Sequence, residues 1–142
     1  MMRIQVVAGV IYRDYKALGH SSEALILIAR RADHLHQGGL WEFPGGKVEP
    51  NETHYQSLVR ELKEELNITV TNALPMMQIT HDYSDKKVTL DIWKVTSFDG
   101  YPEGVEGQET RWVSVAELRD YDFPAANQPI LDQLFSSHLP PG

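Results

Sequence analysis

Apolar side chains gather in five short stretches that are separated by polar and turn-forming residues. The first two stretches are rich in Val, Ile and Leu, which is typical of β-strands. Ser84, Asp85 and Lys86 lie between the third and fourth stretches and suit a hairpin turn. The pattern predicts strands over residues 4–12, 24–28, 77–83 and 88–95, and a short strand that includes 111–113.

A different period follows residue 53 and predicts an amphipathic helix. Leu58, Leu62 and Leu66 recur every four residues and therefore lie on one helical face. Thr53 followed by Gln56 forms a capping box, which marks the start of a helix. Asn67 suits the left-handed position at which such a helix ends.

Two shorter helices are predicted near the end of the chain. Ser114 with Glu117 is a second capping box and opens a helix of about two turns. The last helix runs from residue 127 or 128 to 135, with Pro129 in its first turn, where a missing N–H costs little. Strands interleaved with helices indicate an α/β or α+β sandwich.

The composition is that of one ordinary globular domain over residues 1–142, with a frayed tail at 136–142. Hydrophobic residues make up 42% and charged residues 23% of the 142 residues. No apolar run approaches the roughly 20 residues that span a bilayer, and the start of the chain reads as a strand rather than a signal peptide. We therefore expect a cytoplasmic protein that makes no membrane contact.

The absence of cysteine excludes disulfides, thiolate metal sites and cysteine nucleophiles. A net charge of −7 argues against a partner that is a nucleic-acid polymer, because such binding proteins are normally basic. A small polyanion remains a possible ligand if divalent cations lie between its phosphates and the protein's carboxylates.

The predicted long helix carries a row of acids beside its apolar stripe. Glu61, Glu64 and Glu65 stand at i, i+3 and i+4 and so project from one face. Mg²⁺ prefers such oxygen ligands, and two ions about 4 Å apart can polarise a phosphate and generate a hydroxide nucleophile. Taken alone, the three acids would more simply be a solvated helix face.

The spacing around these acids favours a metal site, because it resembles the Nudix box at every defined position but one. The match comprises Gly46, five residues, Glu52, seven residues, then Arg60-Glu61-Leu62, Glu64-Glu65 and Ile68. The exception is Asn67, where the family pattern has glycine. Asparagine is the next-best residue at a position of positive φ, so we expect a slightly weaker helix end and an intact site.

The resemblance implies a fold, a cofactor and a ligand set. The fold is an α/β/α sandwich around a mixed β-sheet. The cofactor is Mg²⁺, with Mn²⁺ as a possible substitute, bound by Glu61, Glu64, Glu65 and the carbonyl of Gly45. Glu52 and Arg60 are implied to be structural, and the pair formed by Gly45 and Gly46 lets the backbone turn tightly beside the metal.

A more specific resemblance, to the MutT-type branch of the family, covers most of residues 4–134. It is carried by segments 30–33, 41–47 and 122–129, which have similar order and spacing. It implies that Arg31 contacts phosphate or sugar, that Phe43 and Asn127 bind the base, and that Glu106 binds metal or activates water. The alternatives are a surface arginine, a core phenylalanine, a helix-capping asparagine and an inert loop glutamate.

The implied activity is Mg²⁺-dependent hydrolysis of a nucleoside triphosphate, 8-oxo-dGTP or dGTP, to the monophosphate and pyrophosphate. One alternative is a related hydrolase of CTP, of modified pyrimidine triphosphates or of a nucleoside diphosphate derivative such as a nucleotide sugar. Another is a nucleotide-binding module without catalysis, although such a module could lose Glu61, Glu64 and Glu65 freely and this chain keeps all three. A monomer and a homodimer are both compatible with the sequence.

Overall fold

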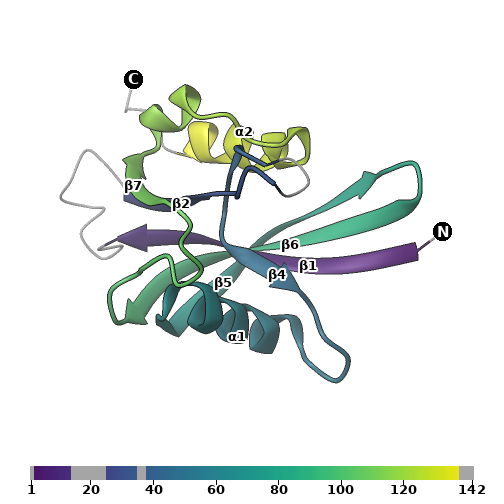
Figure 1. The fold of residues 1–142 in the computed structure, drawn as a ribbon, viewed down its shortest axis with the longest axis horizontal. Helices are drawn as coiled ribbons and strands as arrows, with labels where there is room; N and C mark the ends of the chain where they lie inside the picture. The colour runs from purple at the N-terminus through teal and green to yellow at the C-terminus, as the bar shows by residue number, and fades with distance from the viewer. Residues whose placement is uncertain (1, 14–24, 35–37, 138–142) are drawn as a thin grey trace.

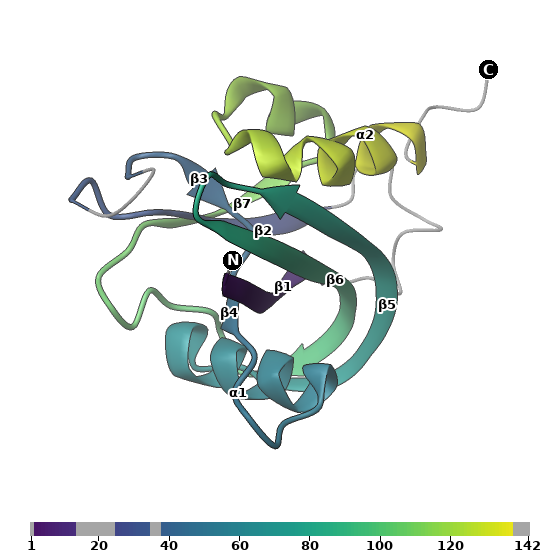
Figure 2. The same ribbon diagram turned by 90° about the vertical axis from the view of Figure 1, so that its right-hand side faces the viewer.

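A mixed sheet of seven strands lies between two α-helices in the computed structural model, which describes residues 2–13, 25–34 and 38–137 (Figures 1 and 2). The strands are β1 (Met2–Arg13), β2 (Leu25–Arg30), β3 (Trp41–Glu42), β4 (Gly45–Lys47), β5 (Thr69–Asp82), β6 (Lys86–Asp99) and β7 (Thr110–Ser114). The α-helices are α1 (His54–Leu66) and α2 (Gln128–Ser137), and short 3₁₀ helices span Ala116–Asp120 and Ala125–Asn127. This arrangement confirms the predicted α/β/α sandwich.

The sheet is mixed because β1 runs parallel to β6 and antiparallel to its other neighbours. The main order is β3-β2-β1-β6-β5, with β4 paired to β1 and β7 paired to β2. β4 and β6 flank β1 in one part of the sheet, with Val7 opposite Gly46 on β4 and Asp91 on β6. Residues of β4 therefore lie beside the centre of the sheet, next to α1.

Two separate apolar cores form on the two faces of the sheet. Leu58, Leu62 and Leu66 of α1 are fully buried against residues such as Val7 and Val95. On the other face, α2 and the 3₁₀ helices cover a second core. Its buried members include Trp41 of β3, Phe43 directly after β3, and Ile130, Leu131 and Leu134 of α2.

The ends of α1 are held by contacts that the sequence predicted. The Thr53 hydroxyl accepts a hydrogen bond from the Gln56 N–H at 3.1 Å, and the Gln56 side chain accepts from the Thr53 N–H at 2.9 Å. Asn67 ends the helix with φ 57° and ψ 37°, as predicted for a left-handed position. His54 also binds Asp91 of β6 and Gln5 of β1, each at 2.8 Å, and so ties the start of α1 to the sheet.

Several boundaries differ from those predicted. β5 begins at Thr69 rather than residue 77; Pro75 interrupts the apolar pattern there and is tolerated because β5 lies at the sheet edge, beside a bulge. β3 and β4 were not predicted, since two or three residues carry no periodic signal. The reciprocal hydrogen bonds between Ser114 and Glu117 are present, but the segment that follows is a 3₁₀ helix of five residues with Val115 at its N-cap, rather than the predicted helix of about two turns.

The frayed tail at the end of the chain was also predicted to begin too early, at residue 136. α2 continues to Ser137, so residues 136 and 137 are helical, and 138–142 lie outside the described residues. The predicted strand residue 24 likewise lies outside the described part of the chain.

The left-handed position of Asn67 leads to a stability prediction. Asn67→Gly should leave the free energy of unfolding close to that of the wild type, because glycine accepts positive φ and the lost Asn67–Glu103 hydrogen bond is exposed. Asn67→Val should lower it by about 1 kcal/mol or more, because a β-branched side chain resists this backbone conformation. Denaturant unfolding measures both. Equal stability of the two variants would contradict this account of the helix end.

Candidate functional site

The first part of the site is the contact between α1 and β4. A Cβ atom built on Gly46 would clash with the Glu61 carboxylate, so a larger residue here would force this carboxylate to move from its position against the β4 backbone. A Cβ on Gly45 would lie 1.9 Å from the Val7 carbonyl oxygen, so Gly45 is needed for β4 to approach β1. The two glycines let an acidic helix face lie directly beside a strand.

Arg60 organises the acids on the outer side of this contact. Its guanidinium binds both carboxylate oxygens of Glu52, at 2.8 and 3.0 Å, and the Lys47 carbonyl at 3.1 Å. It also binds Glu61 at 2.9 Å and Glu64 at 3.3 Å. A planar guanidinium suits such forked contacts, so the Arg60–Glu52 pair links the loop before α1 to the helix.

A second group of acids lies deeper, at the end of α1. Burial raises the pKa of Glu65 to about 8, and the neighbouring charges of Glu42, Glu61 and Glu106 add to this effect. A backbone hydrogen bond from Gly45 acts in the opposite direction. One carboxylate oxygen of Glu65 is buried without a hydrogen-bond partner among the described residues. When these carboxylates are all ionised, their negative charge is therefore not balanced by the neighbouring groups.

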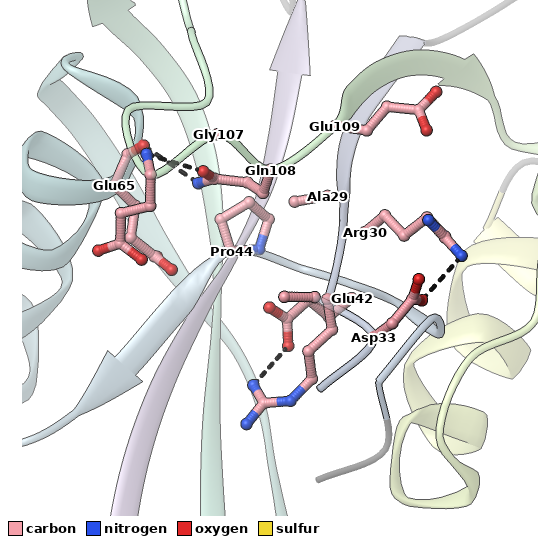
Figure 3. A pocket seen from close by; sticks show the side chains of 12 residues that line it. Ala29, Arg30, Asp33, Glu42, Pro44, Glu65, Gly107, Gln108 and Glu109 are labelled. Atoms are coloured by element: carbon pink, nitrogen blue, oxygen red, sulfur yellow. Dashed lines mark hydrogen bonds and ion pairs between the residues drawn. The ribbon is translucent and has the colours of Figure 1, made fainter. Parts of the chain in front are cut away.

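Three of these acids, Glu42, Glu65 and Glu106, line an open pocket of about 370 Å³. Figure 3 shows Glu42 and Glu65 on its walls. Its walls come from the end of β2, β3, the end of α1 and the loop after Val105. Arg31 lies on the same wall as Glu42, with its guanidinium 3.5 Å from the Glu42 carboxylate. Burial raises the pKa of Glu42, and Arg31 opposes this shift. The pocket thus holds several acids with arginines at its rim.

The predicted metal ligands are partly assembled. Glu61, Glu65 and Gly45 lie together, whereas the Glu64 side chain is 58% exposed and turned toward Arg60. Within the described residues, no three acidic or histidine side chains already surround a single point as metal ligands would. Glu106, which is exposed, lines the same pocket as Glu65, so it is not remote from the other acids.

The predicted base-binding residues lie elsewhere. Phe43 is 4% exposed and stacks on Phe123, with ring centroids 5.2 Å apart, so its ring belongs to the core under α2. Neither Phe43 nor Asn127 is among the residues that line the acidic pocket. Asn127 is half-buried at the junction of a 3₁₀ turn with α2, and its backbone N–H donates to Pro124.

Two residues of the site were missed by sequence reasoning. Glu42 lies between the buried Trp41 and Phe43, and this alternation could have indicated that its side chain points away from the core. The side chain of Gln108 contacts the backbone of both Glu65 and Glu106. Nothing in the local sequence of Gln108 indicates that contact, because it depends on how the loop packs on α1.

Comparison with known proteins establishes the family. Residues 17–133 match the NUDIX domain family profile. The chain is 37% identical over 134 residues to the 8-oxo-dGTP diphosphatase of Escherichia coli (strain K12), covering 94% of this chain and 98% of that protein. It is 39% identical over 132 residues to the CTP pyrophosphohydrolase of the same organism, covering 93% of this chain and 91% of that protein. The chain therefore belongs to the Nudix family and is a Nudix hydrolase, as the box predicted.

Solved structures agree with this assignment. A structure from a study of MutT from Aliivibrio salmonicida and Vibrio cholerae is 44% identical and superposes with a TM-score of 0.80, covering 95% of this chain and 98% of that one. The E. coli ORF135 protein is 36% identical with a TM-score of 0.79, covering 100% of this chain and 96% of that one. The predicted resemblance to the MutT-type branch is confirmed.

None of the helices in the described part of the chain has the length and apolar composition that crossing a bilayer requires.

The Arg60–Glu52 pair leads to a pH prediction. Hydrogen bonds from Arg60 and Ser57 lower the pKa of Glu52 from 4.5 to about 2. The pair therefore stabilises the folded state fully above pH 4.5, and this contribution is lost as the pH falls toward 2. Glu52→Gln should be less stable than the wild type at neutral pH, and its stability should fall less steeply in this acidic window. The free energy of unfolding of both proteins can be measured by denaturant unfolding at successive pH values. If it depended on pH in the same way in Glu52→Gln and in the wild type, the prediction would be contradicted.

Proposed function

We propose that this Nudix hydrolase cleaves nucleoside triphosphates to the monophosphate and pyrophosphate with Mg²⁺ as its cofactor, and that 8-oxo-dGTP and dGTP are its preferred substrates. The observation that carries the proposal is that Glu61 and Glu65 lie against the Gly45–Gly46 backbone, while Glu65 also lines one pocket with Glu106 and Arg31. Such a site combines ligands for a cation with a donor for phosphate oxygens.

The residues fit a divalent cation on physical grounds. Glu65 has a buried carboxylate oxygen without a described partner, and three further carboxylates repel its charge. A cation is the group that removes this repulsion, and hard oxygen ligands favour Mg²⁺ or Mn²⁺. We assign binding to Glu61, Glu64, Glu65 and the Gly45 carbonyl, where Glu64 must turn from Arg60 to take part.

The chain's own groups have distinct tasks in the proposed reaction. Mg²⁺, when bound, neutralises phosphate charge and lowers the pKa of a coordinated water. Arg31 binds phosphate or sugar oxygens and exchanges its Glu42 contact for the substrate. Glu106 accepts a proton from the attacking water or completes the ligand set. Glu52, Arg60 and Gly46 keep the acidic face of α1 in position against β4.

Base selection is assigned to Asn127 and to the backbone around Phe43, under α2. Guanine presents two acceptors on its major-groove edge, whereas the prevailing tautomer of 8-oxoguanine presents an acceptor and a donor. A side-chain amide offers the complementary donor and acceptor. Asn127 makes no side-chain hydrogen bond within the described part of the chain, so capping of α2 does not occupy its amide there.

Cytidine triphosphate is the second candidate substrate, because a relative of nearly equal similarity is a CTP pyrophosphohydrolase. A panel of 8-oxo-dGTP, dGTP, CTP, 5-hydroxy-CTP and ADP-ribose, assayed with and without Mg²⁺, separates the candidates. Pyrophosphate release from 8-oxo-dGTP at the highest kcat/KM is expected. Preference for CTP would overturn the purine assignment, and binding without turnover would overturn the hydrolase.

The metal-ligand assignment predicts large losses of turnover. Glu61→Gln and Glu64→Gln keep side-chain size but remove a charged oxygen, so turnover should fall at least about 100-fold at saturating Mg²⁺. Stability should be close to that of the wild type in Glu64→Gln, because this exposed residue loses both its 3.3 Å ion pair with Arg60 and its repulsion by the other acids of α1. Lys63→Gln, on the exposed side of the same helix, is the control and should keep turnover. Near-normal turnover of both Glu variants would remove the assignment.

The base assignment predicts a change of preference rather than of turnover alone. Asn127→Ala should reduce the kcat/KM ratio of 8-oxo-dGTP to dGTP by roughly 5- to 150-fold, which corresponds to about 1–3 kcal/mol. If Asn127 acts only at the helix start, the melting temperature should fall while the ratio stays constant. If this kcat/KM ratio were unchanged, the assignment as a hydrolase would stand, but the choice of 8-oxoguanine as the preferred base would be contradicted.

A further inference from the structure

A polar clamp joins the loop after residue 102 to the end of α1. The Glu103 N–H donates to the Leu66 carbonyl at 3.0 Å, and the Val105 N–H donates to the Glu65 carbonyl at 3.1 Å. The last carbonyls of a helix lack partners within the helix, so these loop donors satisfy them. Through these bonds the loop is attached to the same helical turn that carries Glu65.

The side chain of Gln108 closes this clamp. Its amide nitrogen donates to the Glu65 carbonyl at 3.3 Å, and its amide oxygen accepts from the Glu106 N–H at 3.0 Å (Figure 3). The two partners define the orientation of the amide, because the reversed orientation would set donor against donor and acceptor against acceptor. A single side chain thus connects the backbones of two pocket acids.

The Glu106 carboxylate needs such a connection. It is exposed, and its side chain makes no hydrogen bond or ion pair within the described residues. Gly104 and Gly107 flank this part of the loop, and Gly107 has φ +83°, so the local backbone is permissive. The place of Glu106 beside the pocket therefore depends on the contacts that hold the loop backbone.

We propose that Gln108 is a positioning residue that holds Glu106 in the acidic pocket through its side-chain amide. This inference rests on the proposed function, because it takes Glu106 as a group that acts on the metal or the water. A simple role in capping α1 would make Gln108 important for stability alone. The positioning role instead makes the effect of Gln108 depend on the presence of the Glu106 carboxylate.

A double-mutant cycle separates these roles. Gln108→Met keeps the length of the side chain but removes both amide contacts, and Glu106→Gln removes the carboxylate. Each single variant should weaken Mn²⁺ binding, measured by calorimetry without nucleotide, and lower turnover by about 10-fold or more. The double variant should be no worse than Glu106→Gln alone. Val105→Ala, which changes an exposed side chain in the same loop, should match the wild type.

Amide hydrogen exchange gives a second readout on the protein without metal or nucleotide. The Glu106 and Val105 amides should exchange faster in Gln108→Met than in Val105→Ala. The inference would be overturned if the losses of turnover and Mn²⁺ binding in the two single variants multiplied in the double variant. It would also be overturned if the Glu106 and Val105 amides exchanged no faster in Gln108→Met than in Val105→Ala. Failure of the proposed function can be distinguished from failure of this inference. In the first case the wild type would be inactive in the nucleotide panel, whereas hydrogen exchange at the Glu106 amide would still test the contact with Gln108.

Discussion

The arrangement of charge around Arg60 is the constraint on which the site depends. One guanidinium binds Glu52, Glu61, Glu64 and the Lys47 carbonyl, so it partly offsets the charge of the outer acids and joins the loop, β4 and α1. The inner acids receive far less compensation, since Arg31 contacts Glu42 and the half-buried Glu65 has acidic neighbours. The contacts of Arg60 thus stabilise the outer side, and the least compensated carboxylates lie around Glu65, next to Glu61.

The parts of the molecule that the sequence predicted are those set by local spacing. Thr53 and Gln56 mark the helix start by a reciprocal contact three residues apart, and Asn67 marks its end by backbone preference alone. Leu58, Leu62 and Leu66 share a face by helical period and are all buried. The Nudix box could be predicted for the same reason, because its acids lie on one helix and the loop that adjoins it.

The parts that were missed depend on tertiary contacts. Pro75 and the bulges beside it are acceptable only because β5 is an edge strand, which no local pattern reveals. β4 exists because Gly45 can approach the Val7 carbonyl, and Gln108 gains its partners from a helix about forty residues earlier in the sequence. The base-binding roles of Phe43 and Asn127 were implied by resemblance, and the fold places them away from the acidic pocket.

The division of the interior into two cores has a consequence for how such enzymes diversify. The acids of the box stand on α1, which is packed on one face of the sheet, whereas Phe43 and the segment before α2 belong to the core of the other face. Substitutions that remodel the proposed base-recognition surface under α2 need not disturb the packing that supports the acids on α1. Selection can therefore exchange one nucleobase for another while inheriting the phosphate chemistry intact, which accords with equally similar relatives that are named for different nucleotides.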